Sequence, residues 1–594
     1  MMRARPAGDA ALLVQADDLA GRLTAAIVSQ RIPGVLDVIP GARTVLVTTE
    51  PGRLDLGELA ERVLALPLPA AGVGATELVE LPVVYDGPDL ADVARLTGLA
   101  VDEVIARHAA AEYTVGWMGF SPGFGYLTGL DPALAAVPRL PEPRLRVPAG
   151  TVAIAGGLAA VYSSTSPGGW RLLGQTSAVL WDPEQDPPAL LAPGMRVRFR
   201  PDAPSATAAP SATAIPDARR GFHDRGSSSA TIVTQLPRSW TGAPAAGADA
   251  PVARSPQPVP PAGRSVEVVR PGPLAIVQDL GRPGFGHLGV PHSGAADAAS
   301  LQLANRLVGN SESAAGLELT LGRAMFRFRG GAWVAVTGAV ARVTVTGGPD
   351  AATATTLGSA AADTPGTSPP GAPGTVASRE MEQGSAFWVP AGGQVQVGAP
   401  SAGLRSYLAV RGGIDVPPML GSRSADLRSG LGPAPLRPGD LLPVGPPGEQ
   451  PADQARLPAR PTPAMPVPGE PTELRVIPGP RDDWFEPGAL DVLCGANYVV
   501  TPASDRTGLR LDGPALRRIR DDELPSDGVV TGALQVPPGG QPILLLADHP
   551  VTGGYPVIAV VATADIGLAA QLRPGVRLRF VLGRPPPGGP VLSH

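Results

Sequence analysis

The sequence predicts a mainly β protein with a small α+β domain at its N-terminus and two β-barrel regions joined by a disordered linker. Three observations predict this fold. The 594 residues include 75 Gly and 72 Pro, which divide the chain into many turns. The runs between these turns are short and β-branched, as strands are, and the motifs of the first half recur in the second. A chain of this length is expected to form about three to five domains.

Residues 1–82 alternate between strand-like and helix-like patterns. The order β-α-β-β-α is typical of a compact two-layer domain. The expected elements are strands at 11–15, 35–40 and 44–50 and helices at about 19–30 and 55–66.

Residues 83–200 are expected to form the first barrel domain, which includes a helix-turn-helix pattern at 89–110. Such a pattern is also found in DNA-binding proteins. The second of these helices carries Asp102, Glu103 and a single Arg107, which give no basic surface for DNA. The net charge of −5, without a basic block, likewise excludes nucleic acid as the expected partner.

Two sets of Gly- and Pro-rich motifs occur in the same order along the chain. The first set is VPAG at 147–150, SPGGW at 166–170 and APGMRVRF at 192–199, and the second is VPPG at 536–539, VTGGY at 551–555 and RPGVRLRF at 573–580. Short β-branched runs flank both sets. The pattern predicts two related barrels, closed or nearly closed, with the second in residues 472–594.

Segments rich in Ala, Pro, Ser and Gly mark the other boundaries. Residues 201–264 are expected to be a disordered linker between the halves, and residues 446–471 a second linker. Residues 265–445 then form the first part of the second half. A further biased segment at about 347–377 is expected to be a loop insertion within it.

The sequence contains no lysine, so all 48 basic residues are arginine. This excludes a P-loop, a Schiff-base lysine and covalently attached biotin, because each needs a lysine side chain. The single cysteine, Cys494, forms no internal disulfide. The histidines show no spacing typical of zinc ligands, so no metal site is predicted.

No apolar run reaches the roughly 18 residues of a membrane helix. The N-terminal residues include three aspartates before any apolar region of a signal peptide can form. We therefore expect a cytoplasmic protein without a membrane partner.

The first candidate segment for chemistry is 113–157. Glycines alternate there with Phe124 and Tyr126, which predicts a ligand pocket walled by aromatic rings, although tight barrel corners show the same pattern. Arg144 and Arg146 follow and could hold a carboxylate or phosphate, with a solvated loop as the alternative.

The second candidate segment is 277–310. Asp279, Arg282 and Asp297 lie in turn-rich sequence before an expected helix, whose N-terminus could bind an anion. The alternative is that Asp297 caps this helix.

The third candidate segment combines 501–516 with the residues up to the VTGGY motif. Acid, base and hydroxyl groups gather here, but no nucleophile-elbow motif is present. The candidate catalytic residues of the chain are Asp279, Asp297, Ser504, Asp505 and Asp548, and the candidate substrate- or nucleotide-binding residues are Phe124, Tyr126, Arg144, Arg146, Arg282, Arg506, Gly553 and Gly554.

Three long motifs of this chain resemble a known family. GFSPGFGYLTGLDPALAAVPRLPEPRLRVPAGTVAIAGG with SPGGWRLLGQT is similar to the B subunit of bacterial ATP-dependent 5-oxoprolinase. VQDLGRPGFGHLGVPHSGAADAASLQLANRLVGN and GALQVPPGGQPILLLADHPVTGGYP, with SDRTGLRLDGP, resemble the C subunit. The family is also known as carboxyltransferase or allophanate hydrolase subunits 1 and 2. The resemblance covers about residues 8–199 and 266–580, so the chain resembles a fusion of the two subunits.

The resemblance implies cyclophilin-like barrels and cleavage of 5-oxo-L-proline to L-glutamate driven by ATP, with Mg²⁺. It also implies that the partner is a separate 5-oxoprolinase A subunit of the LamB/YcsF type, and leaves a homo-oligomer open. One alternative is the carboxyltransferase component of a biotin-dependent urea carboxylase-like system, in which another chain would carry the biotin. A second alternative is a regulatory binding protein of the kinase-inhibitor and antagonist type.

Overall fold

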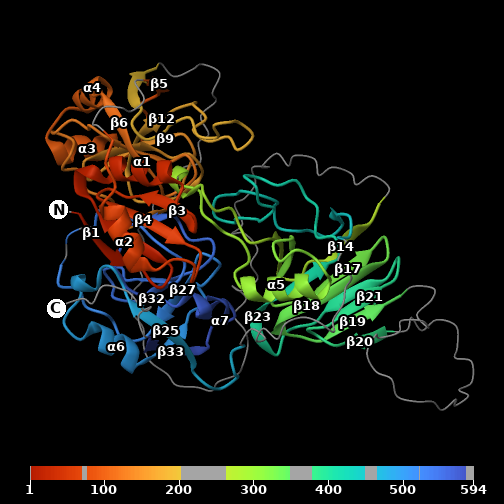
Figure 1. Ribbon diagram of the computed structural model, residues 1–594. Helices are drawn as coiled ribbons and strands as arrows, with labels where there is room; N and C mark the ends of the chain where they lie inside the picture. The colour runs from red at the N-terminus through yellow and green to blue at the C-terminus, as the bar shows by residue number, and fades with distance from the viewer. Residues whose placement is uncertain are drawn as a thin grey trace, which may run out of the picture.

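The computed structural model describes residues 2–69, 77–202, 263–347, 378–448, 465–520, 522 and 524–583. In Figure 1 the red N-terminal domain lies between an orange barrel and a blue barrel, and a green and cyan β-sandwich lies beside them. The two expected linkers and the expected loop insertion fall mostly outside the described residues. None of the described helices is long and apolar enough to cross a membrane.

The N-terminal domain is a four-stranded antiparallel sheet in the order β1-β2-β4-β3. Alternate residues such as Leu12 and Val47 pack against the two helices, whereas Leu13 and Leu46 on the other face pack against the second barrel. All five expected elements are present, and β1, which lacks an apolar alternation, was not expected. The elements are β1 (Arg3–Pro6), β2 (Ala11–Gln15), α1 (Ala20–Gln30), β3 (Val35–Pro40), β4 (Thr44–Thr49) and α2 (Leu56–Leu64).

The first barrel is a seven-stranded sheet in the order β12-β9-β10-β7-β6-β13-β5. A bridge between Val84 and Gln175 joins its two ends. The expected helix-turn-helix is present as α3 and α4, which pack on the barrel, and Gly98 ends α3 at a φ of 73°. The elements are β5 (Leu78–Val83), α3 (Leu90–Thr97), α4 (Val101–Ala110), β6 (Tyr113–Met118), β7 (Gly125–Thr128), β8 (Arg144–Val147), β9 (Thr151–Ala155), β10 (Leu158–Val161), β11 (Ser166–Gly168), β12 (Arg171–Gln175) and β13 (Arg196–Pro201).

The first part of the second half is a β-sandwich of a six-stranded sheet, β20-β19-β22-β17-β14-β24, and a five-stranded sheet, β15-β16-β23-β18-β21. Its core includes Phe326 and Leu317 from the two sheets. Helix α5 packs on strands β18 and β23 of the five-stranded sheet (Figure 1). The elements are β14 (Ser265–Arg270), β15 (Leu274–Gln278), α5 (Ala298–Leu307), β16 (Gly316–Thr320), β17 (Ala324–Phe328), β18 (Ala332–Val340), β19 (Val343–Thr346), β20 (Ser378–Met381), β21 (Ala386–Val389), β22 (Gln394–Val397), β23 (Ala402–Val410) and β24 (Leu441–Pro443).

The second barrel is closed, in the order β25-β32-β29-β30-β27-β26-β33. Apolar residues such as Leu474, Leu534 and Phe580 fill it. The elements are β25 (Thr472–Pro478), α6 (Ala489–Gly495), β26 (Asn497–Val500), β27 (Gly508–Asp512), β28 (Asp527–Gly528), β29 (Ala533–Gln535), β30 (Ile543–Leu545), β31 (Thr552–Gly553), β32 (Val557–Val561), α7 (Ile566–Ala570) and β33 (Arg577–Leu582).

The two barrels share one strand order, so the predicted duplication is confirmed. Strands β5 to β13 correspond in sequence to β25 to β33, and in both barrels the first and last strands pair in parallel. The GG motifs occupy equivalent places before β12 and β32, and the PG motifs occupy equivalent places before β13 and β33. The VP motifs do not, because VPAG precedes β9 whereas VPPG follows β29. That part of the motif alignment was wrong.

Candidate functional site

A small cleft opens where the first barrel meets the second half of the chain. Residues 120–122 and 164–167 line it from the first barrel, and Pro291, Arg428 and Ser429 line it from the second half. Its volume of about 40 Å³ corresponds to about three water molecules. The cleft therefore has room for a small anion or a phosphoryl group, and it needs residues of both halves.

Arg428 supplies positive charge to this cleft. Its guanidinium carbon lies 5.4 Å from the centre of the Phe120 ring, a cation–π contact between the two halves. No hydrogen bond or ion pair joins this guanidinium to another residue in the described part of the chain. Burial lowers the pKa of Arg428, and the carboxylates of Asp426 and Asp505 act in the opposite direction. The guanidinium stays charged at neutral pH and is available to a ligand.

A serine hydroxyl in the cleft wall also lacks a partner. The side-chain oxygen of Ser166 is buried and makes no hydrogen bond to the described residues, whereas the hydroxyl of Ser429, across the cleft, interacts with the carboxylate of Asp426. A buried hydroxyl without a partner costs free energy, so native structures usually provide one. An oxyanion in the cleft would accept hydrogen bonds from Ser166 and from Arg428. These two residues come from different halves of the chain.

The carboxylate of Asp426 holds the loop that carries Arg428. Its Oδ1 accepts hydrogen bonds from the backbone N–H groups of Arg428 at 2.9 Å and Ser429 at 3.1 Å. Burial and the neighbouring charge of Asp548 raise the pKa of Asp426, and the hydrogen bonds from the backbone and side chain of Ser429 act in the opposite direction. The N–H of Leu427 lies 3.5 Å from Asp548 Oδ2, at the limit of a hydrogen bond. Asp548 thereby connects the loop to the protein interior.

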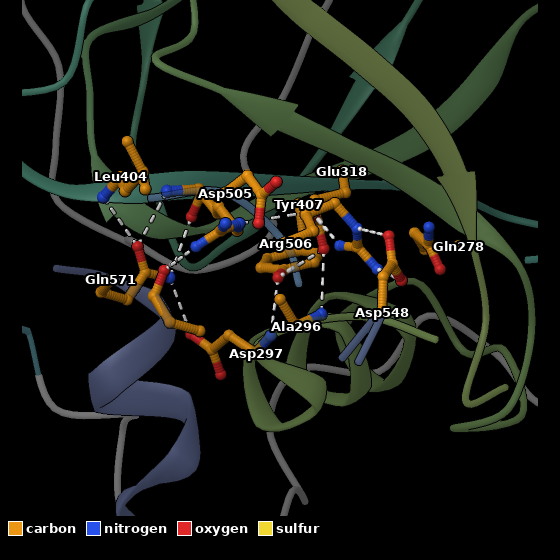
Figure 2. A network of polar contacts seen from close by, with 12 residues as sticks. Gln278, Ala296, Asp297, Glu318, Leu404, Tyr407, Asp505, Arg506, Asp548 and Gln571 are labelled. Atoms are coloured by element: carbon orange, nitrogen blue, oxygen red, sulfur yellow. Dashed lines mark hydrogen bonds and ion pairs between the residues drawn. The ribbon is translucent and has the colours of Figure 1, made fainter. Parts of the chain in front are cut away.

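A buried ion-pair network joins the sandwich to the second barrel (Figure 2). Arg506 contacts Glu318 on β16, and it donates from Nε and Nη2 to Asp548 at 2.9 and 3.0 Å. All three side chains are at most 3% exposed. Burial lowers the pKa of Arg506 and raises that of Glu318, but the opposite charges outweigh burial, so the pKa of Arg506 is raised and that of Glu318 is lowered. The hydroxyl of Ser293 adds a bond of 2.8 Å to Asp548.

Asp297 caps helix α5 and lies in the same network. Its carboxylate accepts from the N–H of Ser300 at 3.1 Å, from the Ser300 hydroxyl at 2.6 Å and from Gln571 at 2.8 Å. The expectation that this helix N-terminus could receive an anionic ligand is therefore corrected, because the protein's own carboxylate occupies it. Gln571 also accepts from the backbone of Leu404 and Arg405, both at 2.8 Å, and so connects the barrel to β23 (Figure 2).

Asp279 and Arg282 lie behind the loop of the cleft. Asp279 accepts from the hydroxyls of Ser422 at 2.6 Å and Ser424 at 2.5 Å and from the N–H of Arg423 at 2.6 Å. Arg282 is 1% exposed and donates to the carbonyl of Ser424. Both residues therefore fix the segment that leads into residues 426–429.

Ser504 and Asp505 form the turn before β27. Ser504 Oγ accepts from the N–H of Arg510 at 3.0 Å, and Asp505 Oδ1 accepts from the N–H of Thr507 at 2.7 Å. The Asp505 side chain is exposed and lies within electrostatic reach of Arg428. Asp505 is thus the predicted catalytic carboxylate that the structure brings to an accessible position beside the cleft.

Phe124 and Tyr126 pack in an apolar cluster with Val147 and Trp170, separate from the barrel core, rather than forming an open pocket wall. They are 2% and 6% exposed, and their ring centres are 5.0 Å apart. The Phe124 ring lies 5.1 Å from Phe120, which lines the cleft. Phe124 therefore supports the ring on which Arg428 rests, and Tyr126 packs against Phe124.

The remaining predicted binding residues lie on β8, which forms a two-stranded sheet with β11, and in the VTGGY turn. Arg144 forms an ion pair of 2.7 Å with Asp89, and Arg146 is exposed on the same strand. Gly553 lies against Gln535 and is half-buried, as is its neighbour Gly554.

Several residues of the site were not predicted from sequence. Arg428, Asp426 and Ser429 lie in an irregular loop without a recognisable motif, and Glu318 is a single carboxylate within a strand. Tyr407 is buried on β23, where its hydroxyl donates to Glu318 at 2.9 Å. The sequence signal for Glu318 was an acidic residue at a core position of a strand, because a buried charge requires a partner.

A larger hollow of about 310 Å³ lies between the sandwich and the second barrel. Two arginines line it, but Arg573 bonds the carbonyls of Gly403 and Pro400, and Arg577 bonds that of Gly469. These cations are engaged by the protein itself. The smaller cleft is therefore the better candidate site, since the cation of Arg428 and the hydroxyl of Ser166 are available there.

The fold and the cleft between the halves define a carboxyltransferase-domain protein. Residues 2–191 match the family model described as carboxyltransferase domain, subdomain C and D, and residues 288–364 and 370–582 match subdomain A and B. A solved structure of the protein TTHA0988 is 32% identical, covers 98% of this chain and 100% of its own, and superposes with a TM-score of 0.71.

Two curated relatives from Escherichia coli match the two halves separately. One, the C subunit of 5-oxoprolinase, is 34% identical over 53% of this chain and 90% of its own length, and the other, the B subunit of 5-oxoprolinase, is 42% identical over 29% and 79%. The chain belongs to the family of the 5-oxoprolinase B and C subunits, with both parts in one polypeptide. Urea amidolyase of Lachancea kluyveri is 31% identical over 53% of this chain but only 17% of its own length.

Proposed function

We propose that the chain is the fused B and C component of an ATP-dependent 5-oxoprolinase, an amidohydrolase that opens 5-oxo-L-proline to L-glutamate. One observation carries the proposal: the cleft combines the cation of Arg428 with the available hydroxyl of Ser166, and both halves contribute to it. The relatives named as the B and C subunits support the same reaction. The reaction takes place in the cytoplasm, where ATP is available.

ATP makes the chemistry feasible, because the lactam carbonyl is a poor electrophile. In the proposed sequence the γ-phosphoryl group of ATP is transferred to the lactam oxygen, which releases ADP. Water adds to the activated carbon, the C–N bond opens, and a second water displaces phosphate to leave glutamate. The positive charge of Arg428 and the hydroxyl of Ser166 would stabilise the transferring phosphoryl group.

The residues present fit a phosphoryl group. The cleft volume of about 40 Å³ leaves no room for a whole nucleotide, so the nucleoside lies outside it. Mg²⁺ is commonly held by phosphate oxygens, water and one or two carboxylates. Asp505, exposed beside Arg428, is the carboxylate that suits such a role. The chain lacks lysine, so these contacts must come from arginine, hydroxyls and backbone amides.

The direct test mixes the purified chain with a LamB/YcsF-type A subunit, ATP and 5-oxoproline and measures glutamate. We expect glutamate from the complete mixture and none when residues 1–202 or 263–594 are left out. Lactam labelled with ¹⁸O at its carbonyl should deliver the label to phosphate. Unlabelled phosphate would remove the phosphorylated intermediate.

The similarity to urea amidolyase favours a second candidate, a carboxyltransferase that receives carboxyl groups from biotin on another chain. A biotinylated carrier protein with its carboxylase, bicarbonate, ATP and urea tests this candidate. Carboxylation of urea that requires this chain would support it, whereas the 5-oxoprolinase proposal predicts none.

A further inference from the structure

Phe120 has a backbone conformation that bulky residues rarely adopt. Its φ is 64°, in the left-handed region, where an L side chain is strained. The loop between β6 and β7 is closed by backbone hydrogen bonds of Gly119, Ser121 and Phe124, and none of these bonds uses the N–H of Phe120. A strained residue persists only where its surroundings hold it. The contacts of Phe120 with other segments therefore decide its conformation.

Thr552 supplies the hydrogen bond that the loop of Phe120 lacks. The N–H of Phe120 donates to Oγ1 of Thr552 at 2.9 Å, across the junction of the two halves. Thr552 is 2% exposed and lies on β31, where it pairs with Gly528 of β28. A Cβ atom at Gly119 would lie 2.5 Å from the same hydroxyl oxygen, so the two segments are in close contact. The hydroxyl of Thr552 therefore has a fixed position against Phe120.

The turn that carries Thr552 does not itself require a hydroxyl. The motifs SPGGW and VTGGY occupy equivalent places in the two barrels, and Pro167 stands in the first motif where Thr552 stands in the second. A proline side chain can neither donate nor accept a hydrogen bond. The first barrel thus builds the same turn without a hydroxyl, and the contact with Phe120 accounts for the hydroxyl in the second.

Phe120 is held between two residues of the second half. Thr552 binds its backbone, and the guanidinium carbon of Arg428 lies 5.4 Å from the centre of its ring. The ring centre also lies 5.1 Å from that of Phe124 and 6.1 Å from that of Tyr162. A rotation of the Phe120 backbone out of the left-handed region would move the ring, and the cation–π contact with Arg428 would be lost.

We propose that Thr552 is a positioning residue of the candidate site: its hydroxyl holds Phe120 in the left-handed conformation, and Phe120 holds the Arg428 cation where an oxyanion enters the cleft. Thr552 does not line the cleft, so its effect on the ligand passes through Phe120. The phosphoryl nature of the ligand rests on the proposed function.

The test compares Thr552→Val, which replaces the hydroxyl with a methyl group, with Thr552→Ser, which retains the hydroxyl. In the complete system with the A subunit, we expect Thr552→Val to lower kcat/KM for glutamate formation about tenfold, as loss of a buried hydrogen bond does, and Thr552→Ser to retain most of the activity. Thr563→Val is the matched control, because it removes another hydroxyl bond between the halves, of 2.7 Å to Asp9, and Thr563 does not line the cleft. It should keep the wild-type activity. Thermal unfolding checks that each variant is folded, and Thr552→Ala takes the place of an unfolded Thr552→Val, since Ala and Ser differ by the hydroxyl alone.

A double-mutant cycle shows whether Thr552 acts through Arg428. In the Arg428→Gln background, Thr552→Val should cause no further loss of kcat/KM, because the cation that Thr552 positions is gone. Two losses that multiply would assign Thr552 a structural role alone and overturn the proposal, while the proposed function would stand.

Inorganic phosphate, titrated by calorimetry, gives a readout that does not depend on glutamate formation. We expect phosphate to bind about tenfold more weakly to Thr552→Val than to the wild-type chain, and to bind Thr552→Ser almost as well as the wild type. Equal affinities of the wild type and Thr552→Val would overturn the positioning role. A wild-type chain that yields no glutamate with the A subunit would remove the proposed function instead, and phosphate binding would then decide the role of Thr552.

Discussion

The guanidinium carbon of Arg428 lies 5.4 Å from the centre of the Phe120 ring, so a loop of the second half rests on an aromatic side chain of the first. The ring is supported from behind by Phe124, and the loop is held by Asp426. Because the Arg428 guanidinium has no hydrogen bond to the described residues, this contact positions a cation without neutralising it. The relationship places the candidate site at the junction of the two halves.

Replacing Arg428 with Gln should lower kcat/KM for glutamate formation by about 10- to 150-fold, the equivalent of one hydrogen bond to a charged group. Steady-state kinetics of the complete system measure this. Arg510→Gln, which removes an exposed arginine from β27, is the control and should retain activity. Equal activity of the two variants would contradict a ligand role for Arg428.

Replacing Ser166 with Ala should weaken ligand binding without lowering stability. The hydroxyl has no internal partner among the described residues, so its removal breaks no bond within the protein, but the ligand loses about 0.5–1.5 kcal/mol of interaction. Ser293→Ala is the matched control, since it removes a bond of 2.8 Å to Asp548 and should lower the unfolding free energy. Kinetics and chemical unfolding of both variants distinguish the two roles. A loss of stability in Ser166→Ala, with KM unchanged, is the opposite of what we expect.

Replacing Arg506 with Met should lower the free energy of unfolding by about 3–5 kcal/mol, because two carboxylates would remain buried without their cation. Denaturant unfolding followed by tryptophan fluorescence measures this. Arg342→Met removes a pair with Glu380 whose side chains are 73% and 55% exposed, and it should leave stability almost unchanged because solvent screens the pair. Similar losses in the two variants would contradict the assigned importance of the buried network.

Stability should fall as the pH drops from 6.5 towards 4, in part because of His549. Burial lowers the pKa of His549 to about 4 from an ordinary 6.5, and the charge of Arg428 adds to this. In that range the unfolded chain binds a proton that the folded chain does not, so acid favours unfolding. His549→Gln should flatten the dependence of the unfolding free energy on pH. Part of the pH dependence should remain in the variant because of His108, whose pKa is lowered by burial to about 3. An unchanged slope in the variant would show that His549 does not contribute.

Much of the fold could be predicted because strand patterns and turn residues are local signals. Strands β2, β3 and β4 of the N-terminal domain and the pair α3 and α4 follow from apolar periodicity, whereas β1, which lacks it, was not predicted. The duplication followed from the GG and PG motifs, which occupy equivalent positions. The VP motifs failed because such a dipeptide suits many turns and does not specify which strand it precedes.

The candidate site could be predicted only in part, because it depends on contacts between distant segments. Arg506 and Asp548 were identified by residue type, but their common partner Glu318 lies almost two hundred positions before Arg506. Asp297 was recognised both as a cap and as a candidate for chemistry, and the structure shows the cap. Arg428 was missed because a single arginine in a loop carries no sequence signal, and its importance comes from Phe120 opposite it.

A crystal structure of the chain grown with 5-oxoproline and a non-hydrolysable ATP analogue would show whether the cleft between the halves binds an oxyanion. We predict density for an oxyanion between the first barrel and residues 428–429, within hydrogen-bond distance of the guanidinium of Arg428 and the hydroxyl of Ser166. Ligand density that lies elsewhere, with water alone between these two side chains, would contradict the proposed site.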